Sequence, residues 1–529
     1  MEPDCQPGET DAPAEGALTT GVARGGLWSV GGQLAGLVAA LFLTPFTIRL
    51  LGPARYGFWA LLQTALGWVG LADFGMSTGS TRIAGERYAK QDGQGEATAV
   101  WTAAAITVLF TAVVAGAASA AAPFVVKTLL HVSAQLVGPA TTAVRLTAAG
   151  CVAAVVMGTT NTPLLLRQRW RSFTLINSGS AVLQVVAIPL LLELAGGGVI
   201  TAAIVSLATS LLGAAGMIYV AVRLQPQMSR PRLQAKVARN LLAFGGALTI
   251  AGIASIVLTS AERLLLAHNR STVDVAYYAV AMRLGTLLWV VPTAIAQPLF
   301  PALVTLHAKG DMAGARLLYR QALQGTYLVL TPLLLVLAFV AHPFLTFWAG
   351  AAYGEHSTHP LLVILAGVWF NSIAWLPATY LTAAVRPSFI AKIELAQVIP
   401  YVAAAAILTA RFGVMGAAAV WSARVAIDAV VFSWTARRMT GVTASPLSSR
   451  AARSLVAPML LGATLLLLSK TTSGLPERAA SGAALTALYG FIAWRTVLSD
   501  RERAGMRSLA GTLAPLRRRA ARAEPPAHG

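Results

Sequence analysis

Apolar stretches of about twenty residues follow one another along almost the whole chain, separated by short polar segments. A helix needs about 20 apolar residues to cross the hydrocarbon core of a bilayer. The runs are continuous and do not alternate with polar residues, which favours helices over the strands of a membrane barrel. The predicted spans lie at about 27–50, 57–79, 100–126, 146–166, 174–196, 198–222, 241–267, 275–305, 324–350, 359–385, 390–411, 413–436, 455–469 and 480–497.

These spans predict an all-α polytopic membrane protein with two six-helix lobes, two extra C-terminal helices and about 14 spans in all. The polar segment RLQPQMSRPRLQAKVARN separates the two series of six. The predicted divisions are a polar tail, an N-lobe, a linker, a C-lobe, a C-terminal pair of spans and a basic tail, at residues 1–25, 26–222, 223–240, 241–437, 438–498 and 499–529.

Composition excludes a soluble enzyme. Hydrophobic residues make up 56% of the 529 residues and charged residues only 11%, against about 25% charged in an ordinary soluble protein. The two cysteines, Cys5 and Cys151, are far apart and form no metal-binding or disulfide pattern. The sequence has no glycine-rich nucleotide loop followed by lysine, so we expect neither ATP hydrolysis nor any cofactor.

The net charge of +20 is a topology signal. Lys and Arg gather in alternate connections and in the C-terminal tail, whereas the opposite connections hold few of them. By the positive-inside rule, both termini face the cytoplasm and the chain lies in the cytoplasmic (inner) membrane. We expect contacts with anionic lipid headgroups and no binding of nucleic acid, because no compact basic domain is present.

Two segments repeat with similar spacing. LLGPARYGFWALLQ (50–63) precedes a span and then YAKQDGQGEA (88–97), while STVDVAYYAVAMRL (271–284) precedes a span and then HAKGDMAGA (307–315). Chance similarity of short loops is the alternative explanation. Paired bundles of this kind place a substrate pathway between them, so the repeat favours a transporter.

The segments TIRLLGPARYGFWALLQTALGWVGLADFGMSTGSTRIA (47–84), ERLLLAHNRSTVDVAYYAVAMRL (262–284) and PLFPALVTLHAKGD (298–311) resemble the polysaccharide-biosynthesis flippases. These O-antigen and exopolysaccharide exporters belong to the multidrug/oligosaccharidyl-lipid/polysaccharide superfamily. The resemblance implies a MATE-like fold that opens to either side in turn and a substrate made of a polyprenyl diphosphate carrying an oligosaccharide. It implies no catalytic signature. We expect a monomer, with polysaccharide polymerase or other assembly proteins as further partners.

Arginines inside or near the spans are the candidates for binding a diphosphate, because the guanidinium fork suits phosphate oxygens and buried charges usually face a cavity. The candidates are Arg283, Arg424, Arg49 and Arg263. Three acidic residues are candidates for ion coupling: Asp73, Glu262 and Asp428.

Each candidate also has a structural interpretation. Arg49 and Arg263 lie near span ends, where long side chains reach the interface. Arg424 and Asp428 are four residues apart and can pair on one helix face. Asp73 can cap a helix end before GMSTGS.

Three functions therefore compete. The first is a flippase for a lipid-linked oligosaccharide. The second is an ion-coupled drug or cation antiporter of the same superfamily, which needs acidic residues in its cavity. The third is a membrane polymerase or ligase, which needs a long outer loop with catalytic residues, and every predicted outer loop is short. The arginines favour the flippase.

Overall fold

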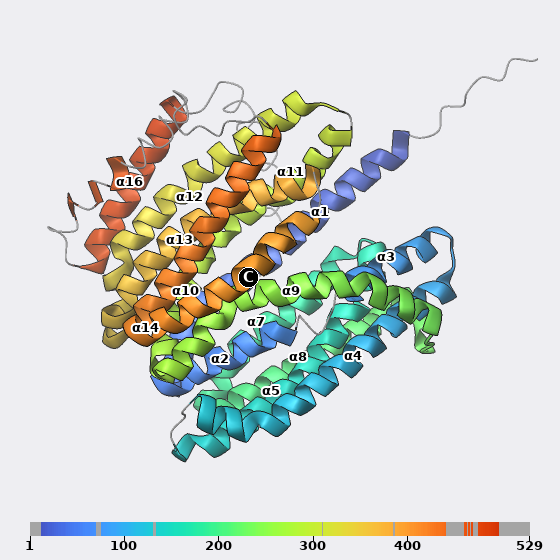
Figure 1. Cartoon of the computed structure of the whole chain (residues 1–529), viewed down its shortest axis with the longest axis horizontal. Coiled ribbons are helices and arrows are strands. Elements are labelled where there is room, and N and C mark those ends of the chain that lie inside the picture. Colours follow the sequence, from blue (N-terminus) through green and yellow to red (C-terminus); the bar gives the residue numbers. More distant parts are fainter. Residues whose placement is uncertain are drawn as a thin grey trace, which may run out of the picture. The chain divides into compact units, whose positions relative to one another are not determined.

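The protein is all-helical throughout the part that the computed structural model describes, namely residues 12–69, 76–130, 134–308, 310–384, 387–440 and most of 460–496 (Figure 1). Within those ranges, nine helices are long and apolar enough to cross a membrane. The fold class predicted from the apolar runs is therefore confirmed.

The α-helices of the first half are α1 (Ala12–Leu51), α2 (Pro53–Val69), α3 (Met76–Ala89), α4 (Gly93–Phe124), α5 (Ala134–Thr160), α6 (Thr162–Leu166), α7 (Trp170–Ala195) and α8 (Val199–Leu224). A short π-helix, η1 (Val125–Leu129), extends the helix that ends at Phe124. Helices α7 and α8 lie close to the spans predicted at 174–196 and 198–222, whereas α1 and α5 begin well before the predicted residues 27 and 146. The span predicted at 57–79 corresponds to α2 and the beginning of α3.

In the second half, the predicted span 275–305 consists of two helices joined by a 3-10 turn, η3 (Leu287–Trp289). The α-helices are α9 (Ala235–Asn269), α10 (Thr272–Thr286), α11 (Val290–Ala308), α12 (Met312–Ala349), α13 (Ala351–Ala384), α14 (Pro387–Thr440) and α16 (Leu475–Thr496). The predicted spans 390–411 and 413–436 correspond to the two helical halves of α14. The backbone of Gly413, between them, is not helical. Most of the span expected at 455–469 lies outside the described residues.

The chain forms two compact units, each with its own core. The larger comprises Met1–Leu287, Trp348–Ile364 and Arg386–Arg424, and the smaller comprises the remaining segments. In the larger unit, α4 packs against α5, and α8 against α5 and α7. Small residues permit these close approaches, since Ala97, Ala99, Ala103 and Ala221 are almost completely buried.

The exterior carries large apolar side chains. Phe42, Leu109, Val113, Leu194 and Ile399 are all exposed, the last by 80%. Large apolar side chains are unfavourable in water but favourable in contact with lipid tails. The exposed faces of the helices are thus suited to hydrocarbon.

The Ala-Lys-x-Asp repeat forms the same helix start in both halves. The Asp92 carboxylate accepts a hydrogen bond from the Gly95 amide at 2.8 Å, at the beginning of α4, and the Asp311 carboxylate accepts one from Gly314 at 2.8 Å, at the beginning of α12. Both are N-caps, which satisfy amides that lack a partner in the first helical turn. The repeat therefore has a structural role at each start.

A buried ion pair connects the beginning of α4 with the ends of α6 and α8. Arg167, which follows α6, donates to both carboxylate oxygens of Glu96 at 2.6 and 3.0 Å. It also donates to Gln225 at 2.5 Å, and Gln225 donates in turn to the Gly93 carbonyl at 2.8 Å. Glu96 is 1% exposed. We call Glu96, Arg167 and Gln225 the brace, because they join α4, α6 and α8.

Helices α2 and α10 meet at a glycine. A β-carbon added to Gly57 would collide with the backbone carbonyl of Thr272. Only the smallest residue permits this approach, because even an alanine would force the two helices apart. The contact fixes α2 beside α10, and these two helices form two walls of the cavity described next.

Candidate functional site

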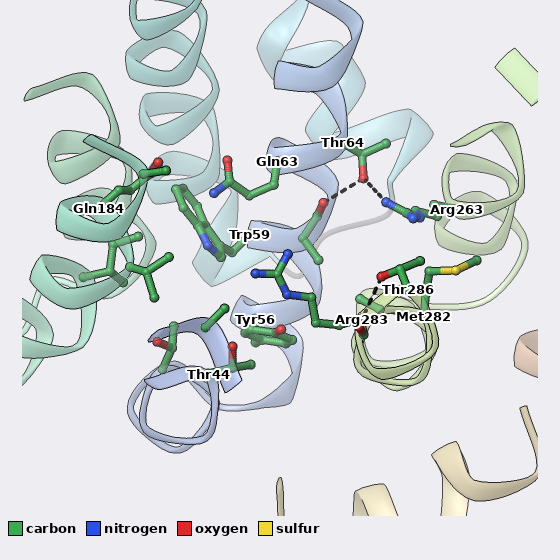
Figure 2. A pocket seen from close by; sticks show the side chains of 17 residues that line it. Thr44, Tyr56, Trp59, Gln63, Thr64, Gln184, Arg263, Met282, Arg283 and Thr286 are labelled. Carbon is green, nitrogen blue, oxygen red and sulfur yellow. Dashed lines mark hydrogen bonds between the residues drawn. The ribbon is translucent and has the colours of Figure 1, made fainter. Parts of the chain in front are cut away.

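A cavity of about 460 Å³ lies within the larger unit. Its walls come from α1, α2, α7, α9 and α10, and Figure 2 shows the side chains that line it. The lining residues are Ala40, Thr44, Thr47, Tyr56, Trp59, Ala60, Gln63, Thr64, Ala181, Gln184, Val185, Ile188, Arg263, Ala279, Met282, Arg283 and Thr286. Among the described residues, this lining includes two arginines and no carboxylate.

Helix α2 presents one continuous face to the cavity. Tyr56, Trp59 and Gln63 follow one another at intervals of three and four residues, which places them on the same side of a helix. The opposite wall carries the Gln184 amide, which donates to Ser206 at 2.9 Å. Aromatic rings, amides and hydroxyls thus alternate around the space, so the cavity is polar in the middle of apolar helices.

Arg283 extends from α10 into this space, with its guanidinium directed toward Trp59 and Gln63 (Figure 2). Its side chain is exposed to the cavity. Among the described residues, no carboxylate lies within ion-pair distance of it. A cation inside a bundle of apolar helices is costly unless it meets an anion or water, so Arg283 is available for an anionic ligand.

Arg263 lines the same cavity, but its guanidinium already has partners within the protein. Its guanidinium donates to the Thr64 hydroxyl of α2 at 3.1 Å and lies 3.7 Å from the Glu262 carboxylate. Glu262 is completely buried and accepts hydrogen bonds from Tyr278 at 3.1 Å and from Tyr401 at 2.7 Å. We call Glu262, Tyr278 and Tyr401 the acidic cluster, because it places a carboxylate directly behind the cavity wall.

The remaining candidates lie elsewhere. Arg49 is an exposed residue in the last turn of α1 and does not line the cavity. Arg424 and Asp428 lie on α14 and do not line it either; Asp428 is buried and Arg424 is half-buried. Asp73 falls in the segment 70–75, outside the described residues. Of the seven predicted site residues, the structure thus places Arg283 and Arg263 at one cavity, with Glu262 adjacent.

Sequence reasoning missed the α2 wall. Tyr56, Trp59 and Gln63 lie in the repeated segment LLGPARYGFWALLQ, but none of them is among the predicted site residues. The spacing of Tyr56, Trp59 and Gln63 was a usable signal, since a polar or aromatic stripe along an otherwise apolar helix indicates a lined cavity. Which helix lies opposite that stripe could not be read from it.

Solved structures share the fold. Lipid II flippase MurJ in an inward closed conformation matches with a TM-score of 0.70 at 12% identity, over 89% of this chain and 99% of that one. A multidrug resistance MATE transporter of the MOP superfamily, in its inward-facing conformation, gives 0.66 at 13% identity, over 76% of this chain and 94% of that one. A MOP superfamily transporter from Pyrococcus furiosus gives 0.56 at 12% identity, over 80% and 95%.

One sequence relative is a Shigella flexneri protein whose name assigns it provisionally to O-antigen transport. It is 25% identical over 181 residues, which are 34% of this chain and 43% of the relative. The chain therefore aligns with less than half of that relative's length.

The family model described as polysaccharide biosynthesis protein matches residues 47–358. The matched region includes α2, α9 and α10 and ends within α13, so it spans every wall of the cavity except most of α1. Because the model covers more than half of the chain, we conclude that the protein belongs to the polysaccharide biosynthesis protein family, with the helical fold of the MOP-superfamily transporters.

Proposed function

We propose that this protein flips a polyprenyl-diphosphate-linked oligosaccharide across the cytoplasmic membrane, for the biosynthesis of a polysaccharide such as O-antigen or exopolysaccharide. The observation that carries the proposal is the guanidinium of Arg283 in a cavity where no described lining residue is a carboxylate. A diphosphate supplies the missing negative charge, and arginine can hold two phosphate oxygens at once.

The charge of the cavity separates this proposal from its main rival. A drug or cation antiporter of the same superfamily needs acidic groups in contact with its substrate. Here the two charged residues in the described lining are both arginines, and the nearby Glu262 carboxylate already accepts two tyrosine hydrogen bonds outside the lining. A cation in this cavity would meet like charges at low dielectric, where repulsion is strong.

Alternating access requires the cavity to open to each side in turn. We propose that the α2–α10 contact at Gly57 and the Arg263–Thr64 hydrogen bond hold one side closed. Glu262 is then the coupling candidate with the best placement, since it adjoins Arg263, the residue that reaches across to α2. Arg424 and Asp428 stay as separate proposals for a charge pair on α14.

A complementation experiment tests the proposal. A strain lacking the gene is supplied with each variant at equal membrane abundance, and surface polysaccharide and accumulated lipid-linked oligosaccharide are both measured. Arg283→Ala should lose most export and accumulate the lipid-linked precursor. Arg283→Lys should retain part of it, because it keeps the charge and loses the two-pronged contact.

The matched control is Arg320→Ala, which removes an exposed arginine of α12 that does not line the cavity. It should export normally. Normal export by Arg283→Ala at ordinary abundance would contradict the proposed binding site, whatever the control does.

A further inference from the structure

A second groove, of about 410 Å³, lies within the smaller unit. Two helices line it, each with one face. Thr293, Ala296 and Phe300 come from α11, at intervals of three and four residues, and Trp375, Ala378, Thr379 and Thr382 come from α13 with the same periodicity. In its described lining, the groove thus combines two large aromatic rings with three hydroxyl groups and no charged side chain.

The ring of Trp375 is held in a fixed orientation. Its indole packs edge to face against Trp289, with ring centroids 6.2 Å apart and planes at 72°. Its helix neighbours Leu376 and Tyr380 belong to the buried core of this unit, so the backbone beneath the ring is anchored as well. Trp375 itself is only half-buried. A flat ring that is fixed in place and partly exposed offers a stacking surface.

The hydroxyl groups around the ring present acceptors. Thr293 donates to the Trp289 carbonyl at 2.8 Å, Thr379 to the Trp375 carbonyl at 2.8 Å, and Thr382 to the Ala378 carbonyl at 2.7 Å. Each hydroxyl has one proton, which its own helix uses, and two lone pairs that remain to accept. The groove therefore accepts hydrogen bonds from a ligand rich in hydroxyl groups.

We infer that this groove binds one pyranose ring of the transported oligosaccharide, with the apolar face of the sugar stacked on Trp375 and its hydroxyls donating to the threonines. The inference rests on the proposed function, and it adds a carbohydrate-binding groove within the smaller unit. An isoprenoid chain is the competing occupant; it would pack against the ring but would use none of the three hydroxyl oxygens as acceptors.

The test uses two kinds of probe on the purified, lipid-reconstituted protein. One is farnesyl diphosphate, and the other is farnesyl diphosphate carrying either glucose or N-acetylglucosamine. The wild type should bind at least one glycosylated probe about five- to tenfold more tightly than the bare probe, the size expected of one good stacking contact. Trp375→Ala should abolish that preference and leave the affinity for the bare probe unchanged. Trp375→Phe should retain most of it.

Two further variants separate a loss of sugar binding from a general effect on the folded protein. Thr379→Val keeps the shape of the side chain, removes one acceptor and should reduce the preference about two- to threefold. Trp434→Ala removes an exposed tryptophan of α14 that does not line the groove, and it should leave the preference intact.

Three results would overturn the inference. One is a wild type with no preference for either sugar, and another is a preference that survives in Trp375→Ala. The third is an equal loss of affinity for bare and glycosylated probes in Trp375→Ala, which would show that the groove holds the isoprenoid. Failure of the proposed function looks different, because Arg283→Ala would then leave the affinity for bare farnesyl diphosphate unchanged.

Discussion

Arg167 and Arg283 carry the same charge but differ in whether a described carboxylate lies beside them. Arg167 lies in the brace, where its guanidinium makes two short bonds to Glu96 and one to Gln225, and its side chain is 17% exposed. Arg283 lies in the cavity and has no carboxylate partner among the described residues. Their sequence contexts do not reveal this difference, but their partners do.

Pairing thus distinguishes a structural charge from an available one. Removing one member of a buried pair leaves the other uncompensated, so the fold should depend on Arg167. Removing Arg283 leaves no such orphan among the described residues, so the fold should tolerate its loss while binding suffers. Arg263 stands between them, since it has a neighbouring carboxylate and still lines the cavity.

The largest expected effect comes from breaking the brace. Glu96→Ala should destabilise the protein by about 3–5 kcal/mol, because it leaves the Arg167 guanidinium without its carboxylate in a mostly buried site. Thermal unfolding in detergent or lipid measures this effect.

The double variant Glu96→Leu/Arg167→Met serves as the control. It removes the whole pair and should recover most of the lost stability, since an apolar replacement of a buried ion pair is often neutral. If the double variant were as unstable as Glu96→Ala, the ion pair would contribute stability that apolar side chains cannot replace.

The next effect concerns the walls of the cavity and involves no charge. Gly57→Ala should destabilise the packing of α2 against α10 by about 1–3 kcal/mol, because the added methyl group would collide with the Thr272 carbonyl. Transport should fall sharply, while the brace stays intact. Cysteine crosslinking between α2 and α10 measures the separation. Unchanged crosslinking and transport would mean that the two helices do not need this contact. Gly116→Ala is the matched control, as a β-carbon there meets nothing.

A smaller effect compares the two repeated helix starts. Asp92→Ala and Asp311→Ala should each cost about 1 kcal/mol, the usual value of an N-cap. Asp92 should be the more costly, because it also pairs with Arg87 at 3.0 Å. Thermal unfolding of both variants checks the order, and a larger loss at Asp311 would contradict it.

The smallest effect is on pH dependence. The amide of Gly95, aided by Arg87, holds the pKa of the Asp92 carboxyl below its usual value. The stability that this ionised cap contributes is therefore complete above the unfolded-state pKa of about 3.9. It is lost as the pH falls through the lower folded-state pKa. Asp92→Asn keeps a capping oxygen without titrating, so its difference from the wild type should shrink as the pH falls below about 4. A constant difference would contradict the assignment.

The sequence predicted the all-helical fold, the approximate positions of many helices and part of the site. Apolar runs fix where helices lie, because length and hydrophobicity alone decide membrane insertion, and the repeated Asp92 and Asp311 were visible as a pattern. Arg283 was selected because charge inside a span is costly. The Tyr56–Gln63 stripe, the brace and the Tyr278–Glu262–Tyr401 bonds were not predicted, because they depend on which helices pack together. Glu262 seemed a span-end residue from its position, yet it is completely buried.

The central claim is that Arg283, which has no carboxylate partner among the described residues, serves an anionic lipid substrate. The most direct measurement is the transbilayer movement of a fluorescent polyprenyl-diphosphate-linked sugar by purified protein in liposomes, with thermal unfolding recorded on the same samples. We predict that Arg283→Ala unfolds at the wild-type temperature and loses at least nine-tenths of the movement, about 1.4 kcal/mol in rate terms, whereas Arg283→Lys keeps an intermediate rate. Undiminished movement by a stably folded Arg283→Ala protein would contradict the claim.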